Sequence, residues 1–172
     1  MRVLFLAFAL LLSPWLTAQR GLRLGSPAFD DGKAIPVKYT CDGQDVSPPL
    51  MWAGDVQDAE EVVLIVDDPD APTAEPFVHW VAYHIPFSLR QLPEGISRTR
   101  EAPFVEGRND FGRVGWNGPC PPRKHGPHRY YFKLYAVKKM PRLAPGLTKK
   151  EVMAAIAPYV VGKATLIGTY ER

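Results

Sequence analysis

The stretch Glu61-Val-Val-Leu-Ile-Val-Asp67, followed by Asp68-Pro-Asp-Ala-Pro72, decides the fold class of this chain. Apolar and β-branched side chains run without interruption from Val62 to Val66, which is the pattern of a strand covered on both faces. The prolines and carboxylates that follow cannot continue a central strand. We therefore predict a buried strand over residues 61–67 that ends in a polar turn.

Two more strands are predicted by alternation of side-chain character. Over residues 77–85, a period of two places Phe77, His79, Val81, Tyr83 and Ile85 on one face, and Val78, Trp80, Ala82 and His84 on the other. Over residues 129–138, one face carries Tyr130, Phe132, Leu134 and Ala136, and His128 extends it. We expect Trp80 and Trp52 to pack in the core.

The C-terminal region predicts one helix and one short strand. Thr148 and Glu151 have the spacing of a capping box, so a helix should run from about Lys149 to Ala157. Pro158 should end or kink that helix. Residues 164–170 read as a last short strand.

Length and composition limit the class of protein. The chain has 172 residues, which predicts one domain, over residues 19–172. Its 18 prolines and 14 glycines indicate many turns between short elements, so we expect no long helical bundle. The formal charge of +3 comes from basic and acidic residues in mixed order, with no basic run that could follow a phosphate backbone. We therefore expect no nucleic acid partner.

The stretch between Leu92 and His125 shows neither a helical nor a strand period. A connection of that length inside a compact domain is usually functional or disordered. Phe104, Phe111 and Trp116 favour an ordered segment, because a disordered one has little use for aromatic side chains.

Residues 1–18 have the pattern of a secretory signal peptide. Arg2 precedes an apolar run from Val3 to Leu12, and Leu16-Thr17-Ala18 offers a small residue before a cleavage site. The apolar run is about half of the roughly 20 residues that span a bilayer, so we expect no stable transmembrane anchor. The protein is predicted to be exported, to the periplasm or out of the cell.

Export bears on the two cysteines, Cys41 and Cys120. In an oxidising compartment they can form a disulfide, whereas in a reducing cytosol they would more often be small buried side chains. A bridge across this separation would stabilise the fold by about 4.5 kcal/mol in the chain-entropy treatment.

Unusual polar residues gather in two clusters. The first holds Asp68, Asp70 and His79, and the second runs from Gly118 through Pro122 to His125-Gly-Pro-His128-Arg-Tyr130. Loops and strand ends commonly carry binding residues. The plainer alternative is that the two aspartates cap a turn and His79 is a core imidazole.

Together these segments resemble a known family. Asp68-Pro-Asp-Ala-Pro72 with His79-Trp80, and Gly118-Pro-Cys-Pro-Pro122 with His128-Arg-Tyr130, resemble the paired signatures of the phosphatidylethanolamine-binding protein (PEBP) family, also called Raf kinase inhibitor-like proteins. Three further segments resemble its bacterial and archaeal branch: Lys38–Gly43, Ser47–Leu50 and Leu166–Arg172. The likeness therefore covers nearly all of the mature chain.

The resemblance implies a β-sandwich-like fold with a large mostly antiparallel sheet, a smaller sheet and a few peripheral helices. It also implies a small anion pocket at one end of the large sheet, for a phosphate-bearing small molecule or a phospholipid head group, with no cofactor and no catalytic residue. By position, its residues are Asp68, His79, Gly118, His128 and Tyr130, with Asp70, Pro121 and Pro122 adjoining.

Two departures from the family pattern bear on the width of the pocket and its head-group preference. Phe77 stands where animal members have a tryptophan, and Cys120 stands where they have a glycine.

The chemistry of these side chains suits an oxyanion. His79 and His128 can donate from imidazole and Tyr130 from its hydroxyl, and backbone N–H groups around Gly118 can approach a ligand closely because glycine has no Cβ. A carboxylate beside a phosphate is repulsive, so we expect Asp68 to orient an imidazole or to accept a proton that the ligand carries.

Two alternatives remain. A metal-dependent hydrolase could use Asp68, Asp70, His79, His125 and His128, although the H-x-x-H spacing is a weak signal that a strand would place on opposite faces. Alternatively, the protein could inhibit another protein by direct contact, and for an exported chain a protease is a better target than a kinase. The sequence also leaves open whether the protein forms an oligomer. His84 and His125 are expected to be structural or surface residues, and Arg129 a salt-bridge partner.

Overall fold

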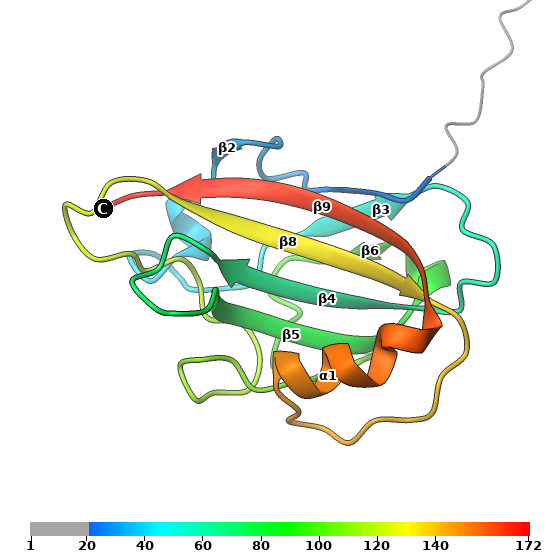
Figure 1. Ribbon diagram of the computed structural model, residues 1–172. Coiled ribbons are helices and arrows are strands. Elements are labelled where there is room, and N and C mark those ends of the chain that lie inside the picture. The colour runs from blue at the N-terminus through cyan, green and yellow to red at the C-terminus, as the bar shows by residue number, and fades with distance from the viewer. Residues whose placement is uncertain (1–20) are drawn as a thin grey trace, which may run out of the picture.

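The computed structural model describes residues 21–172, so the predicted signal peptide over 1–18 lies outside the described residues. The chain forms two sheets (Figure 1). The large sheet has the strand order β2 (Lys33–Ala34), β9 (Val160–Tyr170), β8 (His128–Val137), β4 (Glu61–Asp68), β5 (Phe77–Pro86) and β7 (Val105–Glu106). The small antiparallel sheet has the order β1 (Arg23–Gly25), β3 (Leu50–Ala53) and β6 (Gln91–Leu92).

The large sheet is mixed. Only β2 and β9 pair in parallel, and its other pairs are antiparallel. One helix, α1 (Lys149–Ile156), lies across one face of the sheet, and the small sheet lies behind the other face (Figure 1). Three short 3-10 helices complete the described elements: Val37–Tyr39, Phe87–Leu89 and Ala157–Tyr159. The predicted β-sandwich with few helices is confirmed.

Strand β4 is buried on both faces, as its sequence predicts. Val62, Leu64 and Val66 belong to the core between the two sheets, where Trp52 and Trp80 also pack. The alternate side chains of β4, Val63 and Ile65, contribute to a second core with residues of α1. The uninterrupted apolar run therefore serves two hydrophobic layers at once.

Strand β5 departs from the predicted faces because its register shifts twice against β4. Val66 pairs with Trp80 and Asp67 pairs with Val78, so His79 is an extra residue between them. A second irregularity lies around His84, which has a positive φ of 56°. The expected grouping of His79 with Val81 and Tyr83 was wrong, because β-bulges break the period of two.

The segment between Leu92 and His125 is ordered along the free edge of β5. Apart from β7, scattered hydrogen bonds hold it to β5. Asp110 and Val78 exchange two of them, and the Asn117 N–H donates to the His79 carbonyl. Phe104 and Trp116 pack into the core between the sheets. The order predicted from these aromatic residues is confirmed.

The C-terminal predictions are confirmed with one change of length. Thr148 and Glu151 form both hydrogen bonds of the capping box at the start of α1. The last strand is longer than expected, because the turn Ala157–Tyr159 leads directly into β9 at Val160. Within residues 21–172, none of the helices has the length and apolarity that a membrane crossing requires.

Candidate functional site

A cavity of about 200 Å³ opens at the end of the large sheet where β4 finishes and β5 and β8 begin. This end of the sheet lies on the left in Figure 1. Six of the eight predicted site residues line it: Asp68, His79, Pro121, Pro122, His128 and Tyr130. Ala71, Pro72, Thr73, Phe77, Phe111 and Cys120 complete the lining.

Asp68 and His128 form a buried pair at the base of this site. Nδ1 of His128 lies 2.7 Å from Oδ2 of Asp68, and both side chains are almost fully buried. The other carboxylate oxygen of Asp68 accepts a hydrogen bond from the backbone N–H of Asp70 at 2.8 Å. The carboxylate thus orients the imidazole, as expected from the sequence.

His79 is held in one tautomer by the backbone. Its Nδ1 lies 2.7 Å from the carbonyl oxygen of Asn117, so Nδ1 carries a proton and donates it. Burial lowers the pKa of His79 below its ordinary value, against the smaller opposing effects of the Asn117 carbonyl and the Asp68 charge. The ring is therefore neutral near pH 7, and its Nε2 is an acceptor.

Tyr130 places a hydroxyl donor in the same site. Its side chain is buried, and its oxygen has no hydrogen-bond partner of good geometry among the described residues. Burial, then the nearby charge of Asp68 and the closeness of its carboxylate to the hydroxyl, raise the pKa of Tyr130 well above its ordinary value, although the two groups do not have the geometry of a hydrogen bond. The phenol keeps its proton at any physiological pH, and a buried hydroxyl without a partner is a position that a ligand can satisfy.

Aromatic rings form one wall of the cavity. Phe77 and Phe111 meet edge to face with centroids 4.8 Å apart, and His79 lies 5.5 and 5.3 Å from them. Phe111 is 41% exposed, so part of this wall faces solvent. Phe77 was singled out only as a departure from the family pattern. Nothing in the sequence placed Phe111 at the site, because its position depends on the fold of an irregular loop.

Two predicted site residues do not line the cavity. Asp70 forms a bidentate ion pair with Arg129, at 2.7 and 2.9 Å, which lowers the pKa of Asp70 to about 2. The expectation that Arg129 is a salt-bridge partner is confirmed. The N–H of Gly118 donates to Oδ1 of Asp45 at 2.6 Å, so it is not free for a ligand.

The lack of a Cβ at Gly118 serves packing. A Cβ there would lie 2.1 Å from the carbonyl oxygen of Tyr39, which is closer than real atoms approach. The structure therefore gives this glycine a packing role, and its own N–H is already used by Asp45.

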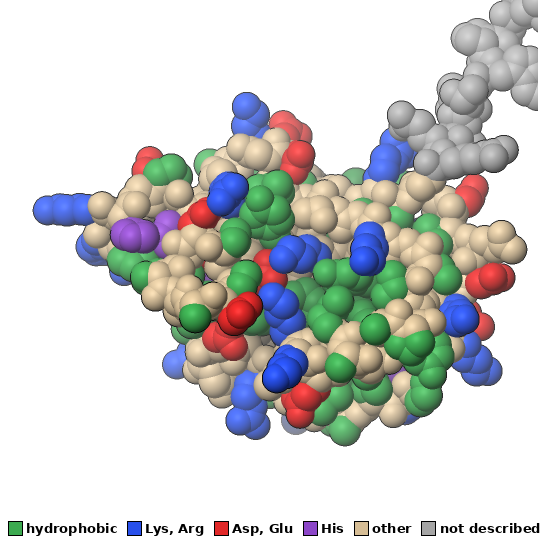
Figure 2. All heavy atoms as spheres, in the orientation of Figure 1, with side chains coloured by type: hydrophobic (Ala, Val, Ile, Leu, Met, Phe, Trp, Pro, Cys, Tyr) green, Lys and Arg blue, Asp and Glu red, His purple; other side chains and the backbone are tan. Residues whose placement is uncertain are grey.

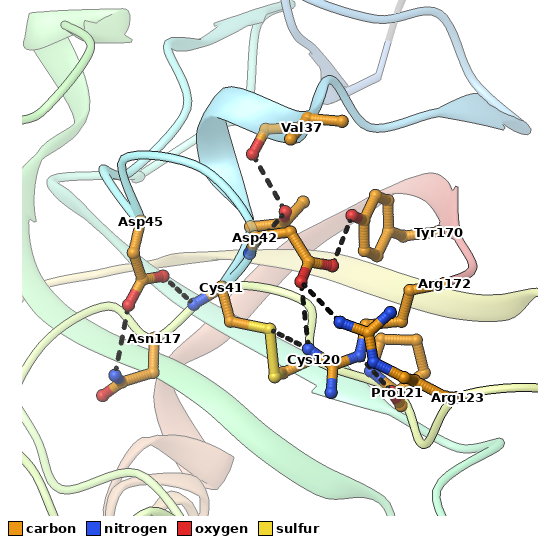
Figure 3. Close-up of a disulfide and its surroundings, with 12 residues drawn as sticks. Val37, Cys41, Asp42, Asp45, Asn117, Cys120, Pro121, Arg123, Tyr170 and Arg172 are labelled. Atoms are coloured by element: carbon orange, nitrogen blue, oxygen red, sulfur yellow. Dashed lines mark hydrogen bonds and ion pairs between the residues drawn. A yellow bond between two sulfur atoms is a disulfide. The ribbon is translucent and has the colours of Figure 1, made fainter.

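Cys41 and Cys120 form a disulfide, with Cα atoms 5.4 Å apart (Figure 3). The bridge ties the loop that lines the cavity to the turn after the first 3-10 helix. Arg172 supports the same loop, because its guanidinium donates to the carbonyl oxygen of Pro121 and to Asp42 (Figure 3). Of the two alternatives for the cysteines, pairing is confirmed.

His125 is exposed, in line with the expectation of a surface or structural residue, and its Nδ1 lies 2.7 Å from Nε2 of His128. The two rings do not lie on opposite faces, because His125 belongs to the turn that precedes β8. The residues that the structure describes contain no group of three or more His, Cys, Asp or Glu side chains that could hold a metal ion.

Sequence comparison relates the chain to proteins of one family. The family profile described as phosphatidylethanolamine-binding protein matches residues 25–171. A UPF0098 protein of Pyrococcus abyssi is 46% identical over 151 residues, which cover 86% of this chain and 84% of the relative. A UPF0098 protein of Methanothermobacter thermautotrophicus is 44% identical over 153 residues, or 88% and 99% of the two chains.

Solved structures agree with the sequence comparison. A phosphatidylethanolamine-binding protein homolog from Chlamydia trachomatis superimposes with a TM-score of 0.81 at 36% identity, covering 89% of this chain and 99% of its own. Escherichia coli YbcL, described as a member of the mammalian PEBP family, gives a TM-score of 0.81 at 29% identity, with 88% and 98% coverage.

Proposed function

This chain belongs to the phosphatidylethanolamine-binding protein family, and from that premise we propose that it binds small molecules or phospholipid head groups that carry a phosphate, in the cavity at the end of the large sheet. The single observation that carries this proposal is the buried Tyr130 hydroxyl, which has no partner of good geometry and lies beside the neutral ring of His79. A cavity of about 200 Å³ is smaller than the roughly 300–1,000 Å³ typical of drug-sized ligands, so it suits a compact polar group.

The polar atoms that have no partner within the protein define how a phosphate would bind. The Tyr130 hydroxyl donates to one phosphoryl oxygen, and a second oxygen shares a proton with Nε2 of His79. Because Nδ1 of His79 is already used by Asn117, this second hydrogen bond needs a proton that the ligand-free site does not hold. A fully deprotonated ligand therefore binds with uptake of a proton, whereas a monoanionic phosphomonoester brings that proton with it, and no step of this proposal requires bond cleavage.

Titration calorimetry with O-phosphoethanolamine, and with inorganic phosphate, tests the proposal. We expect Tyr130→Phe to weaken binding by about ten-fold or more, because it removes a hydrogen bond to a charged acceptor. Tyr135→Phe is the matched control, since Tyr135 lies on the same strand but packs against the core beneath α1. Wild-type protein that binds neither compound, or equal losses in the two variants, would refute this site.

Export is the second part of the proposal. A disulfide is stable in an oxidising compartment and is rare in the cytosol, so the Cys41–Cys120 bridge supports a periplasmic or secreted location. Cell fractionation of the full-length chain, with N-terminal sequencing of the mature protein, tests this directly. Retention of residues 1–18 in a cytosolic fraction would contradict it.

A further inference from the structure

The imidazole of His128 has a partner on each ring nitrogen. Nδ1 contacts the Asp68 carboxylate and Nε2 contacts Nδ1 of His125, both at 2.7 Å. The two histidine rings lie 5.0 Å apart between centroids. His128 is therefore fully hydrogen-bonded, and in this arrangement it has no N–H left for a ligand, contrary to the donor role expected from the sequence.

The contact between His125 and His128 contains one proton. Two nitrogens at this separation form a hydrogen bond only when one of them carries a hydrogen and the other offers a lone pair. If His125 leaves and the shared proton stays on Nε2 of His128, the buried imidazole becomes a donor next to Asp68. A second proton lies between Nδ1 of His128 and the Asp68 carboxylate, so the histidine and the carboxylate together form a pair with no net charge. His125 then departs as a neutral ring with its one proton on Nε2, and neither protons nor charge are gained or lost in the exchange.

His125 is placed where it can leave. Its residue is exposed, whereas His128 is 2% exposed. Figure 2 shows histidine side chains on the molecular surface at the end where β8 begins, beside basic side chains. The turn has positive φ angles at Lys124 and Gly126, and it starts at Pro122, which lines the cavity. Solvent can compensate the hydrogen bond of an exposed imidazole, so its release costs little.

Resting on the proposed function, we propose that His125 is a gate for phosphate: it occupies Nε2 of His128 in the ligand-free protein, and a phosphoryl oxygen displaces it. The charged oxygen makes a stronger hydrogen bond to His128 than the neutral His125 ring does. A neutral hydroxyl gains no such advantage, so His125 also selects anionic ligands against uncharged analogues. This makes His125 a specificity-determining residue of the site, outside the cavity lining itself.

The test compares wild type with His125→Ala in titration calorimetry, using inorganic phosphate, O-phosphoethanolamine and uncharged ethylene glycol as probes. Removal of the competing ring should tighten phosphate binding by about five-fold, the equivalent of one ordinary hydrogen bond. Lys124→Asn is the control, because Lys124 lies in the same turn, its N–H bonds only the Arg172 carbonyl, and asparagine tolerates its positive φ.

A second measurement follows the rings themselves. Long-range ¹H–¹⁵N correlation spectra of the imidazoles should show that phosphate leaves His125 with the signature of a free ring while Nε2 of His128 carries a proton. A merely structural His125 would show neither change.

The outcomes separate the two proposals. Weaker phosphate binding by His125→Ala, unchanged affinity, or unchanged imidazole spectra at saturation would overturn the gate and leave the phosphate site standing. If neither protein binds phosphate, both proposals fail.

Discussion

At the scale of single residues, His79 decides the charge of the site. The extra residue in β5 turns its ring toward Tyr130, 5.2 Å away between centroids, and the Asn117 carbonyl fixes its tautomer. Burial keeps the ring neutral by lowering its pKa. An anion beside it reverses that balance, because a nearby negative charge favours the imidazolium form.

Phosphate affinity should therefore rise as the pH falls from 8 to 6. The complex holds a proton that the free site lacks, and affinity then increases with falling pH by at most about ten-fold per unit for each proton taken up. Calorimetry in buffers of different ionisation enthalpy measures that proton uptake. Affinity that is independent of pH would contradict the assigned role of His79.

The ionisation of the ligand has to be separated from that of the protein. A phosphodiester such as glycerophosphoethanolamine keeps one charge over this pH range, so any slope that it shows belongs to the site. His79→Gln cannot take up a proton, and we expect it to lose the slope with the diester.

The sequence identified most of the residues that line the cavity. It did not show which of their N–H groups are already used in hydrogen bonds within the protein. Asp68, His79, His128 and Tyr130 meet at the cavity because the strands that carry them are neighbours. The hydrogen bonds of Gly118 with Asp45 and of His128 with His125 depend on loop conformations, and loops have no periodicity to read.

At the scale of elements, the end of β4 serves both faces of the large sheet. Asp68 points into the site, whereas Asp67 is fully buried on the other face, 2.7 Å from Nζ of Lys133 and 2.6 Å from Nζ of Lys149. These contacts join β4 to β8 and to the first turn of α1. Two cations compensate one buried carboxylate, and its removal would leave Lys149 without this ion pair and Lys133 with the Tyr131 ring alone.

We expect Asp67→Asn to lower the free energy of unfolding by about 3–5 kcal/mol, as for other broken buried ion pairs. Asp70→Asn is the matched control, because its ion pair with Arg129 is partly exposed and should contribute about 1 kcal/mol or less. Urea denaturation followed by tryptophan fluorescence measures both. Equal losses in the two variants would show that the buried ion pair stabilises the fold no more than the partly exposed one.

The elements themselves were largely predictable, and their irregularities were not. An uninterrupted apolar run identified β4, and the capping box identified the start of α1. The faces of β5 were misassigned because a bulge depends on the partner strand, which one sequence segment does not specify. The length of β9 was underestimated because its first half alternates exposed and half-buried residues and has few large apolar ones.

At the scale of the whole molecule, the site depends on three distant parts of the chain that meet outside the large sheet. The loop from Gly118 to Pro122 is held by Asp45, by the bridge from Cys120 to Cys41, and by Arg172 at the C-terminus. The two bridged residues are 79 positions apart. The disulfide therefore links the stability of the fold to the position of a cavity wall.

The double substitution of Cys41→Ser and Cys120→Ser should lower the free energy of unfolding by about 2–4 kcal/mol, because the unfolded chain regains the entropy that the bridge removes. Cys120 also lines the cavity, so phosphate binding should weaken even where the variant is fully folded. Asp45 and Arg172 still hold the loop, so we expect a partial loss of affinity.

Urea denaturation and calorimetry on the same samples measure the two effects. Ser97→Ala serves as a control for loop stability outside the cavity lining. Unchanged affinity in the folded double variant would mean that the bridge stabilises the chain without positioning the site.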